Sequence, residues 1–374
     1  MLFRSFDRNA LKIRSLAERE SKSCIEKIAV DPLCLPPFKG DRAVLEKIAH
    51  AIGRARKNGR SVILTYGAHL IKNGMGPVLA EMVKKGYVTH LATNGAGSIH
   101  DWEFAFQGKT EEDVRKYIRQ GQFGMWEETG KYINLAVLVG AASGLGYGES
   151  VGKMVAEEKL SFPPFEKAKE RAFRWGESLD ERAVGAMNLY RSMAMLKLPP
   201  GEMPIPHPYK AYSVQSAAFE AKIPLTIHPG FGYDIIYEHP FCSGAAIGIA
   251  SETDFLRFVK SVGLLEGGVY LSVGSAIMSP MVLEKSISMA RNVALQRGEE
   301  IRDFVLAVND IQSGQWNWGS RSEPPKSDPA YYLRFCKSFD RMEPGEMHYI
   351  CEDNRAFLGS LYRLLLENDV CPAG

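Results

Sequence analysis

Several histidine and acidic side chains follow short apolar runs, where they could carry acid–base chemistry. The histidines are His69, His100, His228 and His239, and the acids in the same loops are Asp101, Asp234 and Glu238. Histidine changes charge near neutral pH, and with a carboxylate it can move a proton or hold a metal. Convergence cannot be read from sequence, so an acid–base site, a metal site and ordinary hydrogen-bonded loops all remain open.

Glycine accompanies these side chains in five successive turns. The turns cover residues 66–74, 93–101, 228–239, 274–276 and 309–314, and they include Asn94, Gly97 and Ser275. Glycine lets the backbone approach a ligand, and the amides that open the next helix attract phosphate. A series of such turns favours an extended ligand such as a dinucleotide. The glycines of 144–148 lack the spacing of a phosphate loop, and we expect close packing there instead.

The sequence between these turns predicts an open parallel sheet that would position them. Short apolar runs at 61–66, 88–93, 224–228, 268–273 and 304–308 barely alternate, as strands covered on both faces do. Helical spacing occurs at 43–55, 76–85, 254–262 and 280–294. We therefore predict an α/β fold with a Rossmann-like, doubly wound, mostly parallel sheet. Ligands of such sheets bind outside the carboxyl ends of the strands, where the polar turns fall.

The chain divides into an arm and one domain. Residues 1–45 are charged and then Pro-rich, which predicts an N-terminal extension. Residues 46–374 form a single predicted domain, interrupted at about 160–212 by a helical and Pro-rich insertion across one end of the sheet. Trp316 and Trp318 lie beyond the last apolar run, where they could wall a cleft or plug the core.

Bulk composition favours a cytoplasmic protein. The net charge is +2, so neither nucleic acid nor a membrane surface is an expected partner. The first residues lack the apolar region of a signal peptide. Six cysteines without CxxC spacing predict free thiols in a reducing compartment.

The order of motifs over roughly residues 60–337 resembles deoxyhypusine synthase and its bacterial relatives. The similar segments are SVILTYGAHLIKNG, VTHLATNGAGSIHD, IPLTIHPGFGYDIIYEHP, GGVYLSVGSAIMSPMVLEKSISMARN and DFVLAVNDIQSGQWNWGSRSEPPKSD. The resemblance implies a Rossmann-like fold with NAD across the strand ends. It also implies a tetramer built from dimers, and NAD-dependent oxidation of a polyamine with imine transfer to a lysine.

The same resemblance implies roles for individual residues. Positions that match dinucleotide contacts are Ala68, His69, Thr93, Gly95, His100, Gly274, Asn309 and Asp310. Asp234 matches an aspartate that holds the cationic end of the amine. The family's catalytic lysine is missing, because an ungapped match places Phe335 there; Lys337 stands two residues later and Lys326 precedes it.

We therefore expect an NAD-dependent enzyme on a small amine substrate rather than an authentic deoxyhypusine synthase. In this hypothesis Asp234, Glu238 or Asp310 anchors the cation and His100 or His228 moves the proton, while Lys337 or Lys326 would serve any imine step. One alternative is a hydrolase or lyase in which His228, Asp234, His239 and His100 hold a metal or act as acid and base. Another is a nucleotide-binding protein without catalysis.

Overall fold

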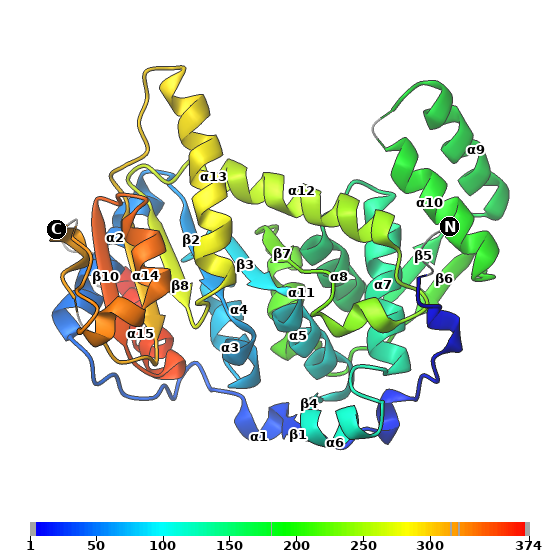
Figure 1. Cartoon of the computed structure of the whole chain (residues 1–374), viewed down its shortest axis with the longest axis horizontal. Helices are drawn as coiled ribbons and strands as arrows, with labels where there is room; N and C mark the ends of the chain where they lie inside the picture. The colour runs from blue at the N-terminus through cyan, green and yellow to red at the C-terminus, as the bar shows by residue number, and fades with distance from the viewer. Residues whose placement is uncertain (1–4, 181, 315, 321, 371–374) are drawn as a thin grey trace.

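The computed structural model describes residues 5–370, apart from 181, 315 and 321 (Figure 1). Its centre is a sheet of six strands in the order β10-β9-β8-β2-β3-β7, and every neighbouring pair is parallel. The strands are β2 (Val62–Tyr66), β3 (His90–Asn94), β7 (Leu225–His228), β8 (Val269–Val273), β9 (Val305–Asp310) and β10 (Glu346–Cys351). The order confirms the predicted Rossmann-like, doubly wound fold.

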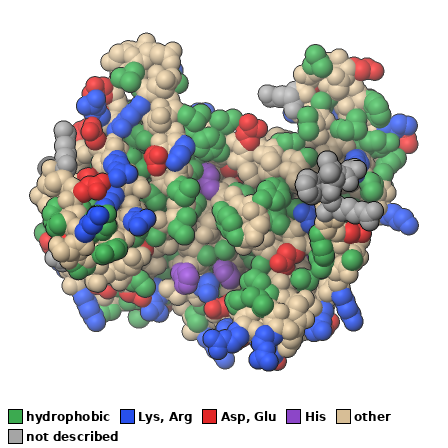
Figure 2. Space-filling model, in the orientation of Figure 1, with side chains coloured by type: hydrophobic (Ala, Val, Ile, Leu, Met, Phe, Trp, Pro, Cys, Tyr) green, Lys and Arg blue, Asp and Glu red, His purple; other side chains and the backbone are tan. Residues whose placement is uncertain are grey.

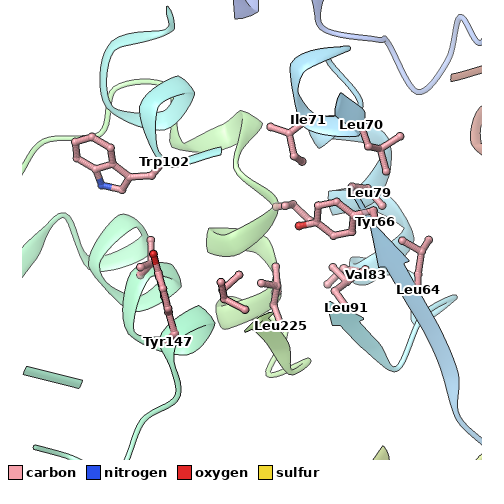
Figure 3. Close-up of a cluster of buried hydrophobic side chains, with 14 of the residues drawn as sticks. Leu64, Tyr66, Leu70, Ile71, Leu79, Val83, Leu91, Trp102, Tyr147 and Leu225 are labelled. Carbon is pink, nitrogen blue, oxygen red and sulfur yellow. The ribbon is translucent and has the colours of Figure 1, made fainter. Parts of the chain in front are cut away.

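The five apolar runs all become strands because both faces of the sheet are covered. Every residue of β2, β8 and β9 is buried. Along β2, Leu64 and Tyr66 enter one apolar core and Ile63 enters the other, as the two-residue period of a strand requires. Figure 3 shows Leu64 and Tyr66 near Leu91 of β3, within the larger of these cores.

Helices cover the two faces of the sheet. The larger core includes α2 (Arg42–Lys57), α4 (Gly76–Lys84) and α15 (Asn354–Val370), and α3 (Ala68–Lys72) follows β2. The opposite face packs against α12 (Gly244–Val262), α13 (Met278–Leu295) and α14 (Arg334–Asp340). The predicted helical segments lie within or overlap α2, α4, α12 and α13.

A long excursion separates β3 from β7. It contains α5 (Gly95–Gln107), β4 (Lys109–Glu112), α6 (Val114–Arg119), α7 (Glu127–Ala141), α8 (Tyr147–Glu157) and α11 (Val214–Glu220). Trp102 of α5 and Tyr147 of α8 are fully buried here (Figure 3). The apolar sides of these helices contribute to the larger core.

The predicted insertion is a helical hairpin inside this excursion. Strands β5 (Lys159–Phe162) and β6 (Gly201–Pro204) pair antiparallel and frame α9 (Phe165–Glu177) and α10 (Ala183–Met195). The hairpin projects from the body, at the upper right of Figure 1, rather than crossing the sheet end as we expected. The division into one arm and one domain stays a prediction.

Two of the glycines of 144–148, Gly146 and Gly148, serve close packing, as predicted. A β-carbon on Gly148 would lie 1.9 Å from the carbonyl oxygen of Leu225, and one on Gly146 would lie 1.7 Å from Oδ1 of Asp254. Asp254 accepts from the amides of Gly148 (3.0 Å) and Ile227 (2.8 Å), and so joins α8 to β7.

The N-terminal arm packs along the lower edge of the molecule in Figure 1. Its strand β1 (Ser21–Cys24) pairs antiparallel with β4, and α1 (Ile25–Ile28) follows. Just before β1, Arg19 forms a buried ion pair with Glu103 of α5, at 2.7 Å. The arm is thus joined to the elements that follow β3.

Within the described residues, no helix combines the length and apolarity needed to cross a membrane. The described cysteines are free thiols, and Cys371 lies outside the described residues.

Candidate functional site

The strand order reverses between β2 and β8, and two glycines meet there. From β2 the chain moves on to β3 and β7, whereas from β8 it moves the other way to β9 and β10. Gly67 directly follows β2 and donates its amide to the Val273 carbonyl at 3.1 Å, while Gly274 directly follows β8 with a φ of 58°. A β-carbon on Gly67 would lie 2.0 Å from the carbonyl oxygen of Gly274. Such a reversal is where open α/β sheets hold their ligands.

Helix N-termini face this reversal. α3 begins at Ala68 directly after Gly67, and the longer α13 begins at Met278. The first amides of a helix have no partner inside it and attract anions. Ser275 stabilises the start of α13, because its hydroxyl accepts from the Ser279 amide at 3.3 Å. The predicted contacts Ala68, His69, Gly274 and Ser275 therefore lie at one point of the sheet edge.

The predicted contacts at the end of β3 use their side chains inside the fold. The buried Thr93 hydroxyl donates to the Tyr66 carbonyl at 2.8 Å, and Gly97 packs against Thr93. Asn94 caps α5 by accepting from the Gly97 amide at 2.9 Å. Contacts of Thr93 and Asn94 with a ligand stay predictions. Because both side chains are hydrogen-bonded within the protein, such contacts would have to come from their backbone atoms.

Asn309 and Asp310 end β9 on the other side of the reversal. The Asn309 amide group donates to Asn354 Oδ1 at 2.7 Å and to the Glu352 carbonyl at 3.2 Å, which ties β9 to α15. Asp310 accepts from the Gln312 amide at 3.1 Å. Asn309 is thus a buried structural link at the edge of the site.

Asp234 lies against Gly95 at the start of α5. A β-carbon on Gly95 would fall 2.4 Å from Oδ2 of Asp234, so only glycine leaves room for this carboxyl group. Asp234 also accepts from the Gly230 amide at 3.0 Å. Burial raises the pKa of Asp234 to about 6, against the opposing effect of that hydrogen bond. A cation beside this carboxyl would favour its ionised form.

His228 ends β7 next to Asn94 of β3. Its Nε2 lies 3.1 Å from the Thr226 hydroxyl, and its ring stands edge-on to Phe258 of α12, with centroids 5.2 Å apart. Burial lowers the pKa of His228 to about 4, so the ring is neutral at physiological pH. His228 faces the α12 side of the sheet.

His100 lies on α5, whose neighbour is α3. Its Nδ1 is 2.8 Å from the Thr110 hydroxyl of β4. Burial lowers the pKa of His100 to about 4, partly offset by Glu103. Figure 2 shows histidine side chains at the surface of the molecule, two of them close to a basic side chain.

Glu238 points away from Asp234, into the turn between α6 and α7. A β-carbon on Gly124 would lie 2.6 Å from its Oε2. Burial raises the pKa of Glu238 to about 7, and the carboxylate of Glu112 adds to the effect. The structure therefore separates two acids that we expected to share one site.

Lys337 is also distant from Asp234. Its Nζ is 3.3 Å from Glu323 and 3.5 Å from the ring centroid of Tyr331, on α14. α14 packs against α13, beside the end of the sheet formed by β9 and β10. Four strand spacings separate β9 from β7, about 19 Å at about 4.8 Å each. A Lys337 nucleophile acting beside Asp234 therefore does not fit.

The remaining candidates have separate partners. His239 pairs with Glu127 at 3.2 Å, and Asp101 accepts from the Ser213 hydroxyl at 2.6 Å. Trp318 is buried in the core, and Trp316 donates to the Ser322 carbonyl at 2.8 Å. His100, His228, Asp234 and His239 therefore do not converge. In the part of the chain that is described, no group of three or more metal-ligating side chains is found.

Sequence reasoning missed two features of this edge. Gly67 matters because of its contact with Gly274, for which the only signal was a glycine directly after a strand. The chain Arg19–Glu103–Thr110 behind His100 is assembled from the arm, α5 and β4, and no spacing pattern links them.

Comparison with known proteins adds little beyond the fold. No family model matches the sequence, and no curated protein matches it. Solved structures similar to the chain include a conserved LOR/SDH protein from Methanococcus maripaludis S2, with TM-score 0.43, 13% identity, and 90% of this chain and 70% of that chain covered. The ternary complex of AgrE with ornithine and NAD+ has TM-score 0.43 and 16% identity, over 90% of this chain and 35% of that chain.

A third similar structure is ArgZ, a cyanobacterial arginine dihydrolase, with TM-score 0.38 and 14% identity, over 87% of this chain and 33% of that chain. This chain spans about a third of the length of AgrE and of ArgZ. Similarity this low carries no argument about activity. The resemblance to deoxyhypusine synthase finds no support among these structures.

Proposed function

We propose that this protein is an NAD-dependent enzyme that oxidises a small amine or amino-acid-like substrate. The observation that carries the proposal is the contact of Gly67 with Gly274 at the reversal of strand order. The absence of side chains there lets a dinucleotide backbone approach both strand ends, and the amides opening α13 can receive its phosphates.

The two turns are packed closely against each other and against α15. A β-carbon on Gly67 would strike backbone, and the one on Gly274 would lie 2.6 Å from Asn354 Nδ2. Ala68, His69 and Ser275 line the same point, and Gly95 lies at the end of the neighbouring strand. Bound NAD would supply a hydride acceptor for a carbon that bears nitrogen.

Two side chains of this chain fit the substrate's needs. Asp234 is the anchor for a cationic amine, because its carboxyl group gains from a nearby positive charge. His100 is the proton acceptor, because it is neutral at physiological pH and lies near the surface between α3 and α5. His228 is an alternative proton acceptor on the α12 side of the sheet.

The activity is tested by supplying NAD with a panel of amines and basic amino acids and following NADH formation. Turnover that falls in Asp234→Asn but persists in Glu238→Gln is the expected result. Turnover lost in Glu238→Gln alone would overturn this assignment. A homotetramer and a cytoplasmic location stay predictions.

A further inference from the structure

A line of hydrogen bonds connects the N-terminal arm to His100. Arg19 donates from Nη1 and Nη2 to the two oxygens of Glu103, both at 2.7 Å. The Thr110 hydroxyl donates to Oε2 of Glu103, and Thr110 in turn lies 2.8 Å from Nδ1 of His100. We infer that Glu103 and Thr110, held by Arg19, are positioning residues that keep one tautomer of His100. This inference rests on the proposed role of His100 as proton acceptor.

The direction of each hydrogen bond follows from the charge of Glu103. Burial alone would raise the pKa of Glu103, but the Arg19 guanidinium holds it below its ordinary value. An ionised carboxylate only accepts, so the single hydroxyl proton of Thr110 points to Glu103. The Thr110 oxygen can then only accept from His100, which places the ring proton on Nδ1.

Nε2 of His100 is consequently the nitrogen with a free lone pair. Among the described residues it has no hydrogen-bond partner, and it is not one of the buried polar atoms that lack one, which indicates that it reaches solvent. A substrate ammonium group placed there would donate a hydrogen bond to Nε2, which is the atom that could take up a proton during the reaction.

Burial and the charges around His100 together keep its ring neutral in the free protein. Glu103 and Glu111 favour the protonated ring, while Lys72 of α3 and Arg19 of the arm disfavour it, and burial disfavours it most. Lys72 is itself paired with Glu111 at 2.8 Å. When the ring takes a proton, the Nδ1–H bond to Thr110 and the Glu103 carboxylate behind it stabilise the new charge.

The arm is therefore part of the site. Strand β1 pairs with β4, and Ser23 stands opposite Thr110 in that pairing. The side chains of Arg19 and Glu103 are each 1% exposed, so the arm covers the carboxylate from solvent.

The test follows the His100 tautomer by NMR of the full-length chain with ¹⁵N-labelled histidine, at neutral pH and without NAD. His100→Gln assigns the signal. Thr110→Val should abolish the single Nδ1–H tautomer and give mixed signals, with Thr110→Ala as a second variant should the valine protein not fold. Thr110→Ser should restore the wild-type pattern.

Thr129→Val is the matched control, because the Thr129 hydroxyl donates to the other oxygen of Glu103, at 2.8 Å, and does not bond to His100. It should keep the wild-type tautomer. A wild-type pattern in Thr110→Val and Thr110→Ala, or an equal change in Thr129→Val, would overturn the inference. NAD titration of the same proteins keeps the two proposals apart, since a wild type that binds no NAD contradicts the function and leaves the tautomer result standing.

Discussion

Gly67 and Gly274 are in contact at the point where the sheet reverses its strand order. The contact is so close that a β-carbon on Gly67 would not fit. An added β-carbon would lie 2.0 Å from the Gly274 carbonyl oxygen. Gly67→Ala should therefore push apart the turns after β2 and β8, and weaken NAD binding at least tenfold, about 1.4 kcal/mol. Calorimetric titration measures this.

The control for that variant is Gly53→Ala in α2, where an added β-carbon meets nothing within 4 Å. It should leave NAD affinity unchanged and stabilise the protein by about 0.5–1 kcal/mol, because alanine suits a helix better than glycine. Equal NAD affinity in both variants would speak against the placement.

Asp234 should limit stability at neutral pH. Its pKa is about 6 in the folded protein, against an ordinary value of 3.8, so the folded state binds more protons between these values and stability falls as pH rises through them. Asp234→Asn should remove this fall and raise the free energy of unfolding at neutral pH by up to about 3 kcal/mol. Urea melts across that pH range measure it; an unchanged pH profile would disprove the burial argument.

Glu238 should lower stability at neutral pH as Asp234 does, but unlike Asp234 it should have no part in function. Its pKa of about 7 exceeds the ordinary glutamate value of 4.5, so stability again falls as pH rises between these two values. Glu238→Gln should stabilise the protein by about 1–2 kcal/mol at neutral pH. NAD affinity should be unchanged, because the side chain faces Gly124 rather than the strand ends.

The buried pair of Arg19 and Glu103 should be the main anchor of the arm. Arg19→Met leaves a carboxylate buried without its partner, which costs about 3–5 kcal/mol. Adding Glu103→Leu should recover part of that loss, as a double-mutant cycle of urea melts would show. A single-variant loss below about 1 kcal/mol would mean that the arm is held elsewhere.

Lys337 should not form an imine. It lies at the far end of the sheet from Asp234 and pairs with the half-exposed Glu323, so Lys337→Met should change stability by no more than about 1 kcal/mol. Borohydride reduction during turnover, followed by mass spectrometry of the peptides, should find no adduct on Lys337. A trapped adduct there would restore the lysine mechanism.

The strands could be predicted because a strand that is buried on both faces has a nearly continuous run of apolar residues. The strands VILTY (β2) and VYLSV (β8) are wholly buried, so their apolar runs can be recognised without knowing their partners. β10 (EMHYIC) was missed, because it is an edge strand with only Ile350 buried and reads as a polar segment.

The sequence predicted the site only at positions whose place is set by the course of the backbone. Gly274 and Ser275 follow directly from the strand ends, and they do lie at the reversal. Side-chain direction is set by packing: Glu238 stands four residues after Asp234 yet turns to Gly124, and His100 is fixed by Thr110 across another strand. Such partners come from distant parts of the sequence, and periodicity carries no information about them.

The most direct test of the account is a calorimetric titration of the purified full-length protein with NAD, after removal and mass-spectrometric identification of any co-purified ligand. The account predicts saturable binding at one NAD per subunit, retained by Gly53→Ala and lost or greatly weakened in Gly67→Ala. A wild-type protein that binds no NAD, and carries no nucleotide through purification, would contradict it.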